Sequence, residues 1–138
     1  MKYLIDTNII SELVSAKPNV NVLKWFDQIP PEVVYISVLT IGEIRKGIEK
    51  LKDSKKKRQL LLWLEHELPR MFDRRIVSIS IEVADRWGRL LGNSAKTLPA
   101  IDSLLAATAL HYDMALVTRN TEDFTECQNL ELINPWIA

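Results

Sequence analysis

Four acidic residues of this chain have the types and placement needed for one shared chemical site, although they lie far apart in sequence. Asp6, Glu43, Asp102 and Asp123 each fall just after a predicted strand or in the early turns of a predicted helix. In folds that alternate strands and helices, the carboxyl ends of parallel strands and the starts of the following helices meet at one edge of the sheet. We therefore expect the four carboxylates to converge at that edge.

Carboxylates that converge repel one another and need positive charge nearby. Two unit charges about 5 Å apart repel by roughly 3 kcal/mol at an effective dielectric constant of about 20. Protons, basic side chains or metal ions can offset this repulsion. Because carboxylate oxygens are hard ligands, the metal ion that we expect is Mg²⁺, with Mn²⁺ as a substitute.

Each acid also has an ordinary structural interpretation when it is taken alone. Asp6 follows two apolar strand residues and can cap the next helix. Glu43 suits a solvated helix position, and Asp102 suits the first turn of a helix, where an acid stabilises the helix dipole. Asp123 lies in a loop-like stretch and suits a turn. Only the joint placement favours a shared site.

The elements that would position these acids alternate between strands and helices. Strands are predicted at residues 3–5, 33–36, 75–79 and 115–117, with a short final strand at 131–133. An apolar stripe between the second and third strands predicts a helix with Glu43 on a neighbouring face. The stripe consists of Ile41, Ile44, Ile48 and Leu51. This alternation predicts an α/β fold.

Three further helices carry clear start or stop signals. Ser54 is placed to cap a leucine-rich helix that Pro69 ends, and Ser80 is placed to cap a helix that ends at Gly92. Pro99 suits the first turn of the last helix, where a missing N–H is tolerated. That helix covers residues 101–112, is rich in small apolar residues and has Asp102 in its first turn.

Composition excludes several classes of protein. The 138 residues suit one domain, and the balance of 18 basic and 18 acidic residues means that any nucleic-acid contact must be local. The single cysteine, Cys127, rules out an intrachain disulfide framework and favours a buried thiol. The first residues lack a signal-peptide pattern, and no apolar run reaches membrane-spanning length. We therefore expect a cytoplasmic protein with no membrane contact.

Four sequence blocks resemble those of the PIN-domain nucleases, and more closely those of the VapC-type ribonuclease toxins of type II toxin-antitoxin systems. The blocks are LIDTNIISEL with Asp6, SVLTIGEIRKGIEKL with Glu43, IDSLLAATAL with Asp102 and LVTRNTEDF with Asp123. They follow the order found in the family and span almost the whole chain. Ser103 departs mildly from the pattern, because alanine or glycine is more usual there, but its small size predicts no loss of activity.

The resemblance implies a single PIN-like domain over residues 1–138, with a parallel central sheet flanked by helices and an acidic site at the carboxyl edge of the strands. It makes the four acids a catalytic, metal-binding cluster. Polar residues at Asn8, Ser11, Thr118 and Asn120 are expected to support that cluster. It also implies a homodimer, an RNA substrate and a cognate antitoxin protein as the partner.

The chemistry of phosphodiester hydrolysis agrees with this interpretation. The reaction needs an activated water, compensation of phosphoryl charge and stabilisation of the leaving alkoxide, and one or two divalent ions supply all three. We expect Asp6 and Asp102 to be the principal metal ligands, with Glu43 and Asp123 as further ligands, directly or through water. This endoribonuclease would then use a metal-activated water, so its products should carry 5′-phosphate and 3′-hydroxyl ends.

Other functions compete with this one. Histidine-based RNA cleavage needs paired imidazoles, whereas His66 lies among charged helix residues and His111 lies at a helix end. A metal-dependent phosphatase or phosphoryl-transfer domain also places an aspartate after its first strand, but DTN lacks the second aspartate that such phosphatases use. A non-catalytic PIN-fold binding module would keep the fold without the chemistry, and the four intact acids argue against it.

Two groups of surface-type residues are weaker indications. A basic run follows the Glu43 helix and is either a solvated charged turn or a contact for RNA phosphates. It consists of Lys50, Lys52, Lys55, Lys56, Lys57 and Arg58. Four tryptophans beside apolar residues favour packing or dimer contacts over base stacking. They are Trp25, Trp63, Trp87 and Trp136.

Overall fold

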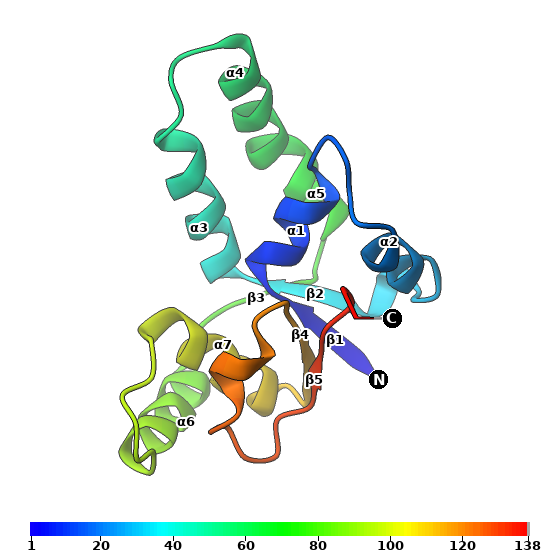
Figure 1. The fold of residues 1–138 in the computed structure, drawn as a ribbon. Helices are drawn as coiled ribbons and strands as arrows, with labels where there is room; N and C mark the ends of the chain where they lie inside the picture. Colours follow the sequence, from blue (N-terminus) through cyan, green and yellow to red (C-terminus); the bar gives the residue numbers. More distant parts are fainter. Residues whose placement is uncertain (138) are drawn as a thin grey trace.

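The computed structural model describes residues 1–137, and in that range a five-stranded parallel sheet carries helices on both faces (Figure 1). The strands are β1 (Lys2–Ile5), β2 (Val34–Ser37), β3 (Ile76–Val77), β4 (Met114–Val117) and β5 (Leu132–Ile133). Their order is β3-β2-β1-β4-β5, and each neighbouring pair runs parallel. The predicted α/β fold with a parallel central sheet is confirmed.

The helices form two layers. The α-helices are α1 (Thr7–Leu13), α2 (Val20–Asp27), α3 (Val38–Glu49), α4 (Lys55–Leu62), α5 (Leu68–Met71), α6 (Ile81–Gly92) and α7 (Ala100–His111). Shorter helical turns are η1 (Pro31–Val33), the π-helical η2 (Trp63–Glu67) and η3 (Thr121–Phe124). Figure 1 shows α1, α3, α4 and α5 on one side of the sheet and α6 and α7 on the other. Within residues 1–137, no helix is long and apolar enough to cross a membrane.

The central strand β1 is buried on both faces. Ile5 belongs to the core shared with α1 and α3, whereas Leu4 belongs to the core shared with α7, because successive strand residues point to opposite faces. Val117 and Leu116 repeat this alternation on β4. All four side chains are fully buried. Packing in the two cores therefore fixes the position of the carboxyl end of β1.

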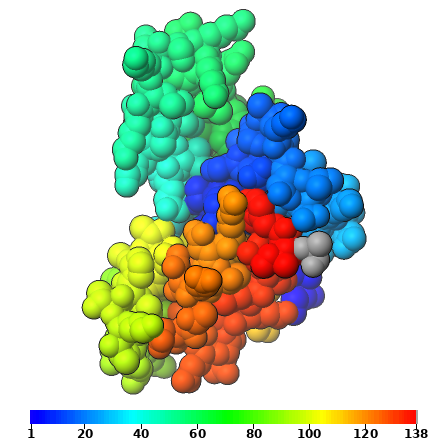
Figure 2. Space-filling view, viewed as in Figure 1, coloured from blue at the N-terminus to red at the C-terminus, as the bar shows by residue number. Residues whose placement is uncertain are grey.

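The sheet order creates a natural place for a site. The chain leaves β1 toward β2 on one side, while β4 lies on the other side of β1. Ligand sites in open parallel sheets form at the carboxyl ends of strands where the connections diverge in this way. Figure 2 shows the surface hollowed between the lobe that contains α3 and α4 and the lobe that contains α6 and η3.

The predicted helix starts agree closely with the structure. The Ser54 hydroxyl accepts a hydrogen bond from the Lys57 backbone N–H (3.1 Å), and the Ser80 hydroxyl accepts one from Val83 (3.2 Å). Pro99, expected in the first turn of α7, is instead its N-cap with extended backbone angles. The shift is one residue and keeps the predicted acid in the first turn.

The prediction that Pro69 ends the leucine-rich helix is wrong. The helix continues through Met71. It does so because η2 is a π-helical turn, in which the Leu68 N–H donates to the carbonyl of Trp63, five residues earlier. A proline ring normally meets the carbonyl four residues before it, and the wider π turn changes that local geometry.

Three other local expectations differ from the structure. The strand expected at 75–79 is reduced to Ile76–Val77. Leu51 was expected in the buried stripe but is 41% exposed, because α3 ends at Glu49. Helix α2 was not predicted, although Asn19 caps it by accepting from two backbone N–H groups of its first turn.

The packing expected of Trp25, Trp63 and Cys127 is confirmed. Trp25 packs edge-on against Tyr3 and Phe26, with ring centroids 5.3 and 4.9 Å apart. Trp63 packs against the same core. Cys127 is buried in the core on the α7 side, and burial raises the pKa of its thiol. A thiol in such surroundings is a poor nucleophile.

Candidate active site

Asp6 lies at the carboxyl end of β1 and is the most buried of the four acids, with 7% of its surface exposed. Its carboxylate accepts hydrogen bonds from the Thr7 backbone N–H at Oδ1 (2.7 Å) and from the Thr118 hydroxyl at Oδ2 (2.8 Å). The Asn8 amide lies 3.5 Å from Oδ2. The same side chain therefore caps α1 and faces the sheet edge.

The surroundings of Asp6 raise its pKa despite these donors. Burial is the largest cause, and the negative charges of Glu43 and Asp123 add to it, while the hydrogen bonds from Thr118 and Thr7 act in the opposite direction. Hydrogen bonds to a carboxylate favour its charged form. A carboxyl that has such donors and still has a raised pKa lacks a compensating positive charge.

Asp102 lies in the first turn of α7 and is half-buried. Burial raises its pKa, and the charges of Asp6, Asp123 and Glu43 raise it further. No hydrogen bond contributes to this shift. Because the charge of Asp6 acts on Asp102 through space, α7 and the end of β1 present their carboxylates to the same region.

Glu43 reaches this region from α3 through a contact with α1. The Thr7 hydroxyl donates to Glu43 Oε1 at 2.6 Å and lies 3.2 Å from the hydroxyl of Thr40. Thr40 is fully buried, whereas Glu43 is partly exposed. The predicted position of Glu43 beside the buried stripe agrees with this exposure.

Asp123 is the most exposed of the four acids. It lies in η3, just after β4, and its backbone N–H donates to the carbonyl of Asn120 (3.1 Å). Its charge contributes to the raised pKa of both Asp6 and Asp102. The charges of Glu43 and Asp123 thus act on both Asp6 and Asp102, and the charge of Asp6 acts on Asp102.

No ion pair found within residues 1–137 neutralises this group. Among the ion pairs found within residues 1–137, none includes Asp6, Glu43, Asp102 or Asp123. Lys46 lines a hollow of about 410 Å³ together with Glu43 but forms none of these pairs. No ion pair found within residues 1–137 therefore compensates the repulsion among the acids.

The donor set fits a divalent cation that keeps much of its water. Within residues 1–137, no three His, Cys, Asp or Glu side chains are arranged closely enough to hold a metal ion by themselves. This excludes a closed protein cage in the present conformation. Mg²⁺ is commonly held by one or two carboxylates and several waters. Burial and neighbouring negative charge raise the pKa of both Asp6 and Asp102, and a bound cation would favour the charged form of each carboxylate.

The expected supporting residues differ in their contacts. Thr118 is buried and accepts from the Asn8 amide (3.3 Å) and from the backbone N–H of Asn120 (3.2 Å). Asn8 and Thr118 thus form one network beneath Asp6, to which Asn120 contributes its backbone. Ser11 is exposed, and it lines a groove that also contains Glu43.

Sequence reasoning missed two hydroxyl residues of the site, Thr7 and Thr40. Thr7 directly follows Asp6, and Thr40 lies one helical turn before Glu43. Those spacings are the signal that was available, because residues three apart on a helix share a face.

The two histidines lie elsewhere in the fold. His66 is exposed on η2. His111 is in the last turn of α7 and packs edge-on against Tyr112, with ring centroids 4.7 Å apart. Asp102 is at the opposite end of the same helix, so this arrangement gives no support to a paired-imidazole mechanism.

The parallel sheet and the acids at its carboxyl edge agree with a known protein family. Residues 3–128 match the family model described as PIN domain, and the chain belongs to the PIN-domain family. This confirms the resemblance drawn from the four sequence blocks.

Several relatives match almost the whole length of the chain. The plasmid stability protein StbB of Pseudomonas syringae pv. tomato is 36% identical and covers 98% of this chain and 99% of its own. Toxin FitB of Neisseria gonorrhoeae is 34% identical and covers 96% of this chain and 97% of its own. VapC ribonuclease Y4jK of Sinorhizobium fredii is 32% identical, covering 96% of each.

Solved structures agree with these sequences. The crystal structure of FitAcB from Neisseria gonorrhoeae superposes with a TM-score of 0.90 at 33% identity, over 99% of each chain. VapBC2 from Rickettsia felis, bound to a DNA fragment from its promoter, superposes with a TM-score of 0.76 at 26% identity, over 97% of this chain and 98% of that chain.

Proposed function

We propose that this chain is the toxin of a toxin-antitoxin pair and acts as a divalent-metal-dependent endoribonuclease. The observation that carries the proposal is the acidic group at the end of β1, in which Asp6 and Asp102 have raised pKa values and no basic partner within residues 1–137. Membership of the PIN-domain family and the names of relatives, toxin FitB and VapC ribonuclease, support the same function.

Each acid has a role in this proposal. Asp6 and Asp102 hold Mg²⁺, for which Mn²⁺ can substitute, and Glu43 and Asp123 contact it directly or through water. When bound, the ion supplies an activated water and offsets charge on the phosphoryl oxygens. Thr118 keeps Asp6 oriented through its 2.8 Å hydrogen bond. The RNA backbone must lie across the hollow beside Glu43 for its phosphate to reach these acids.

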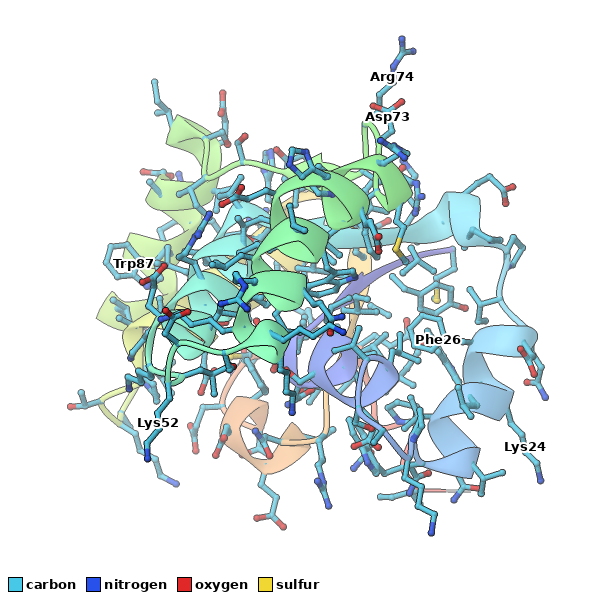
Figure 3. The ribbon with its side chains drawn as sticks, turned by 90° about the horizontal axis from the view of Figure 1, so that it is seen from above. Lys24, Phe26, Lys52, Asp73, Arg74 and Trp87 are labelled. Atoms are coloured by element: carbon cyan, nitrogen blue, oxygen red, sulfur yellow. The ribbon has the colours of Figure 1, made fainter. Side chains whose placement is uncertain are left out.

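The basic turn between α3 and α4 lies at the end of α3 away from the sheet (Figure 1) and is suited to hold RNA phosphates there. Lys57 donates to the carbonyls of Glu49 and Leu51, and Arg58 pairs with Asp53. The exposed lysines around them are Lys46, Lys50, Lys52, Lys55 and Lys56. Figure 3 shows Lys52 extending away from the ribbon. In a chain of zero net charge, such a local concentration is what an RNA contact requires.

An apolar groove offers a surface for the antitoxin. It has a volume of about 190 Å³ and runs between α1, α2 and α5. Its lining includes Ile10, Leu13, Phe26, Trp63, Met71 and Phe72. Figure 3 shows Phe26 directed inward from α2. Because α1 starts beside Asp6, a partner segment in this groove can continue to the acids, where an arginine or lysine would pair with them.

Two further features belong to the proposal. The chain forms a homodimer, which light scattering tests directly; a monomer mass at high protein concentration would contradict it. A toxin that cleaves cellular RNA acts in the cytoplasm, where its substrate is.

The function is tested by incubating the full chain with single-stranded RNA in Mg²⁺ and in chelator. Cleavage should occur only with the metal ion. Asp102→Asn should reduce it by more than the roughly 10- to 100-fold that loss of an outer-shell partner costs. Glu82→Gln, which removes an acid from the first turn of α6 instead, should cleave normally. Equal cleavage by Asp102→Asn and the wild type would overturn the proposal.

The same preparation separates the competing function. A phosphoryl-transfer domain would gain the mass of one phosphate after treatment with acetyl phosphate, and the present proposal expects no such gain.

A further inference from the structure

Thr7 joins two acids of the site. It is the first residue of α1, and its backbone N–H donates to Asp6 Oδ1 at 2.7 Å. Its hydroxyl donates to Glu43 Oε1 at 2.6 Å. One residue therefore fixes the carboxylate before it in the chain and a carboxylate on the neighbouring helix α3.

The direction of the hydroxyl hydrogen bonds follows from the donors available. An ionised Glu43 carboxylate can only accept, so the single proton of the Thr7 hydroxyl is directed to it. With that proton directed to Glu43, the Thr7 oxygen, 3.2 Å from the Thr40 hydroxyl, is free to accept from it. Because Thr40 is fully buried on α3, this second bond holds the Thr7 hydroxyl from beneath.

The bond to Glu43 has the length of a strong contact. Hydroxyl-to-carboxylate bonds of roughly 2.5 to 2.7 Å are charge-assisted and about twice as strong as neutral ones. Glu43 is partly exposed on its helix, and a glutamate in that position otherwise samples several rotamers. Fixing one of them before a ligand arrives removes part of the entropic cost of binding.

We propose that Thr7 is a positioning residue that sets the Glu43 carboxylate beside Asp6 for the divalent cation. This inference rests on the proposed function and adds to it. A carboxylate has about four lone-pair sites, so the bond at Oε1 leaves Oε2 available to the ion or its water. Because Thr7 also holds Asp6, both acids are positioned from one point of the backbone.

The test measures Mn²⁺ affinity by the electron paramagnetic resonance signal of the free ion, with the full chain and without RNA. Thr7→Val removes the hydroxyl and keeps the shape, and it should weaken Mn²⁺ binding by about 10- to 100-fold. Thr7→Ser keeps the hydroxyl and should restore most of the affinity. Thr97→Val, the same substitution at an exposed loop position, should leave the affinity unchanged.

A double-mutant cycle separates positioning from a general structural effect. If Thr7 acts through Glu43, then Thr7→Val should change Mn²⁺ affinity little in a Glu43→Ala background, where no acceptor for the Thr7 hydroxyl remains at position 43. Circular dichroism checks folding, and Thr7→Ala replaces Thr7→Val should the latter not fold. Wild-type affinity in the folded variant lacking the hydroxyl, or a full effect in the Glu43→Ala background, overturns the inference. A wild-type chain that binds no Mn²⁺ overturns the proposed function instead.

Discussion

Replacing Asp102 with asparagine should make the metal-free protein more stable at pH 8. Asp102 is half-buried, and burial together with the charges of Asp6, Asp123 and Glu43 raises its pKa. Asparagine has nearly the same shape without the charge, so the substitution removes both the burial cost and the repulsion. Glu43→Gln is a less direct test, because the Glu43 carboxylate also accepts the Thr7 hydrogen bond.

The size of the effect follows from opposing contributions. One like-charge pair about 5 Å apart costs roughly 3 kcal/mol at an effective dielectric constant of about 20. Solvent screens a large part of this, because Asp102 is only half-buried. The substitution also loses the favourable interaction of an acid with the start of α7, worth about 0.3 to 1 kcal/mol. We expect a net gain of about 1 kcal/mol in the free energy of unfolding.

The dependence on pH has a defined sign. The pKa of Asp102 is higher in the folded state than its ordinary value of about 3.9. The folded state therefore binds this proton more tightly, and the wild type gains stability as the pH falls through the folded pKa. The advantage of Asp102→Asn should accordingly be fully present at pH 8 and shrink as the pH falls toward about 3.9.

Urea denaturation in chelator measures these differences, with Glu82→Gln as the matched control. Glu82 is an acid in the first turn of α6, and hydrogen bonds from its own backbone and from Ser80 lower its pKa, so its substitution should reduce stability. Mg²⁺ at a hundredfold excess over its dissociation constant should stabilise the wild type by about 2.7 kcal/mol and Asp102→Asn by much less. If Asp102→Asn loses stability in chelator as Glu82→Gln does, and Mg²⁺ stabilises the two variants equally, the acids do not share a site.

Three other variants, one of them a double substitution, test the Asp6 support, the RNA contact and the antitoxin surface. Thr118→Val removes a hydrogen bond to the most buried acid, so unfolding free energy should fall by about 1 to 3 kcal/mol in urea denaturation; an unchanged value would remove that bond from the account. Changing Lys52 and Lys56 to glutamate should weaken RNA binding in fluorescence anisotropy and reduce the slope of log affinity against log salt by about 1.4. Lys24→Glu on α2 should leave the slope unaltered, and equal slopes in all proteins would exclude the basic turn as an RNA contact. Met71 lies in the apolar groove and is 58% exposed, so Met71→Asp should abolish inhibition by the antitoxin but keep RNA cleavage. Retained inhibition would show that the antitoxin does not bind in this groove.

The acidic site could be predicted because its position depends on short-range signals. Asp6 follows Leu4 and Ile5, and a strand buried on both faces leaves little freedom in where its next residue lies. Asp102 follows a proline that starts a helix. Once the strands are parallel, their carboxyl ends must share an edge, so local signals were enough to predict which acids approach one another.

The hydroxyl network could not be predicted in the same way. Thr7 and Thr40 look like ordinary helix residues, and their contact depends on how α1 packs against α3. The prediction that Pro69 ends its helix was wrong for a related reason. Proline usually ends a helix, but the π-helical turn η2 precedes Pro69 and the helix continues past it. Tertiary packing decides both cases, and neither leaves a periodic pattern in the sequence.

The most direct test of the central claim is the chemical identity of the RNA ends that the protein produces with Mg²⁺. Hydrolysis by an activated water at the acidic site does not use the ribose 2′-hydroxyl, so every new 5′ end should carry a phosphate and every new 3′ end a hydroxyl. Mass spectrometry of a cleaved oligonucleotide distinguishes these products. A 2′,3′-cyclic phosphate, or cleavage that persists in chelator, would contradict the assignment of the four acids as the catalytic site.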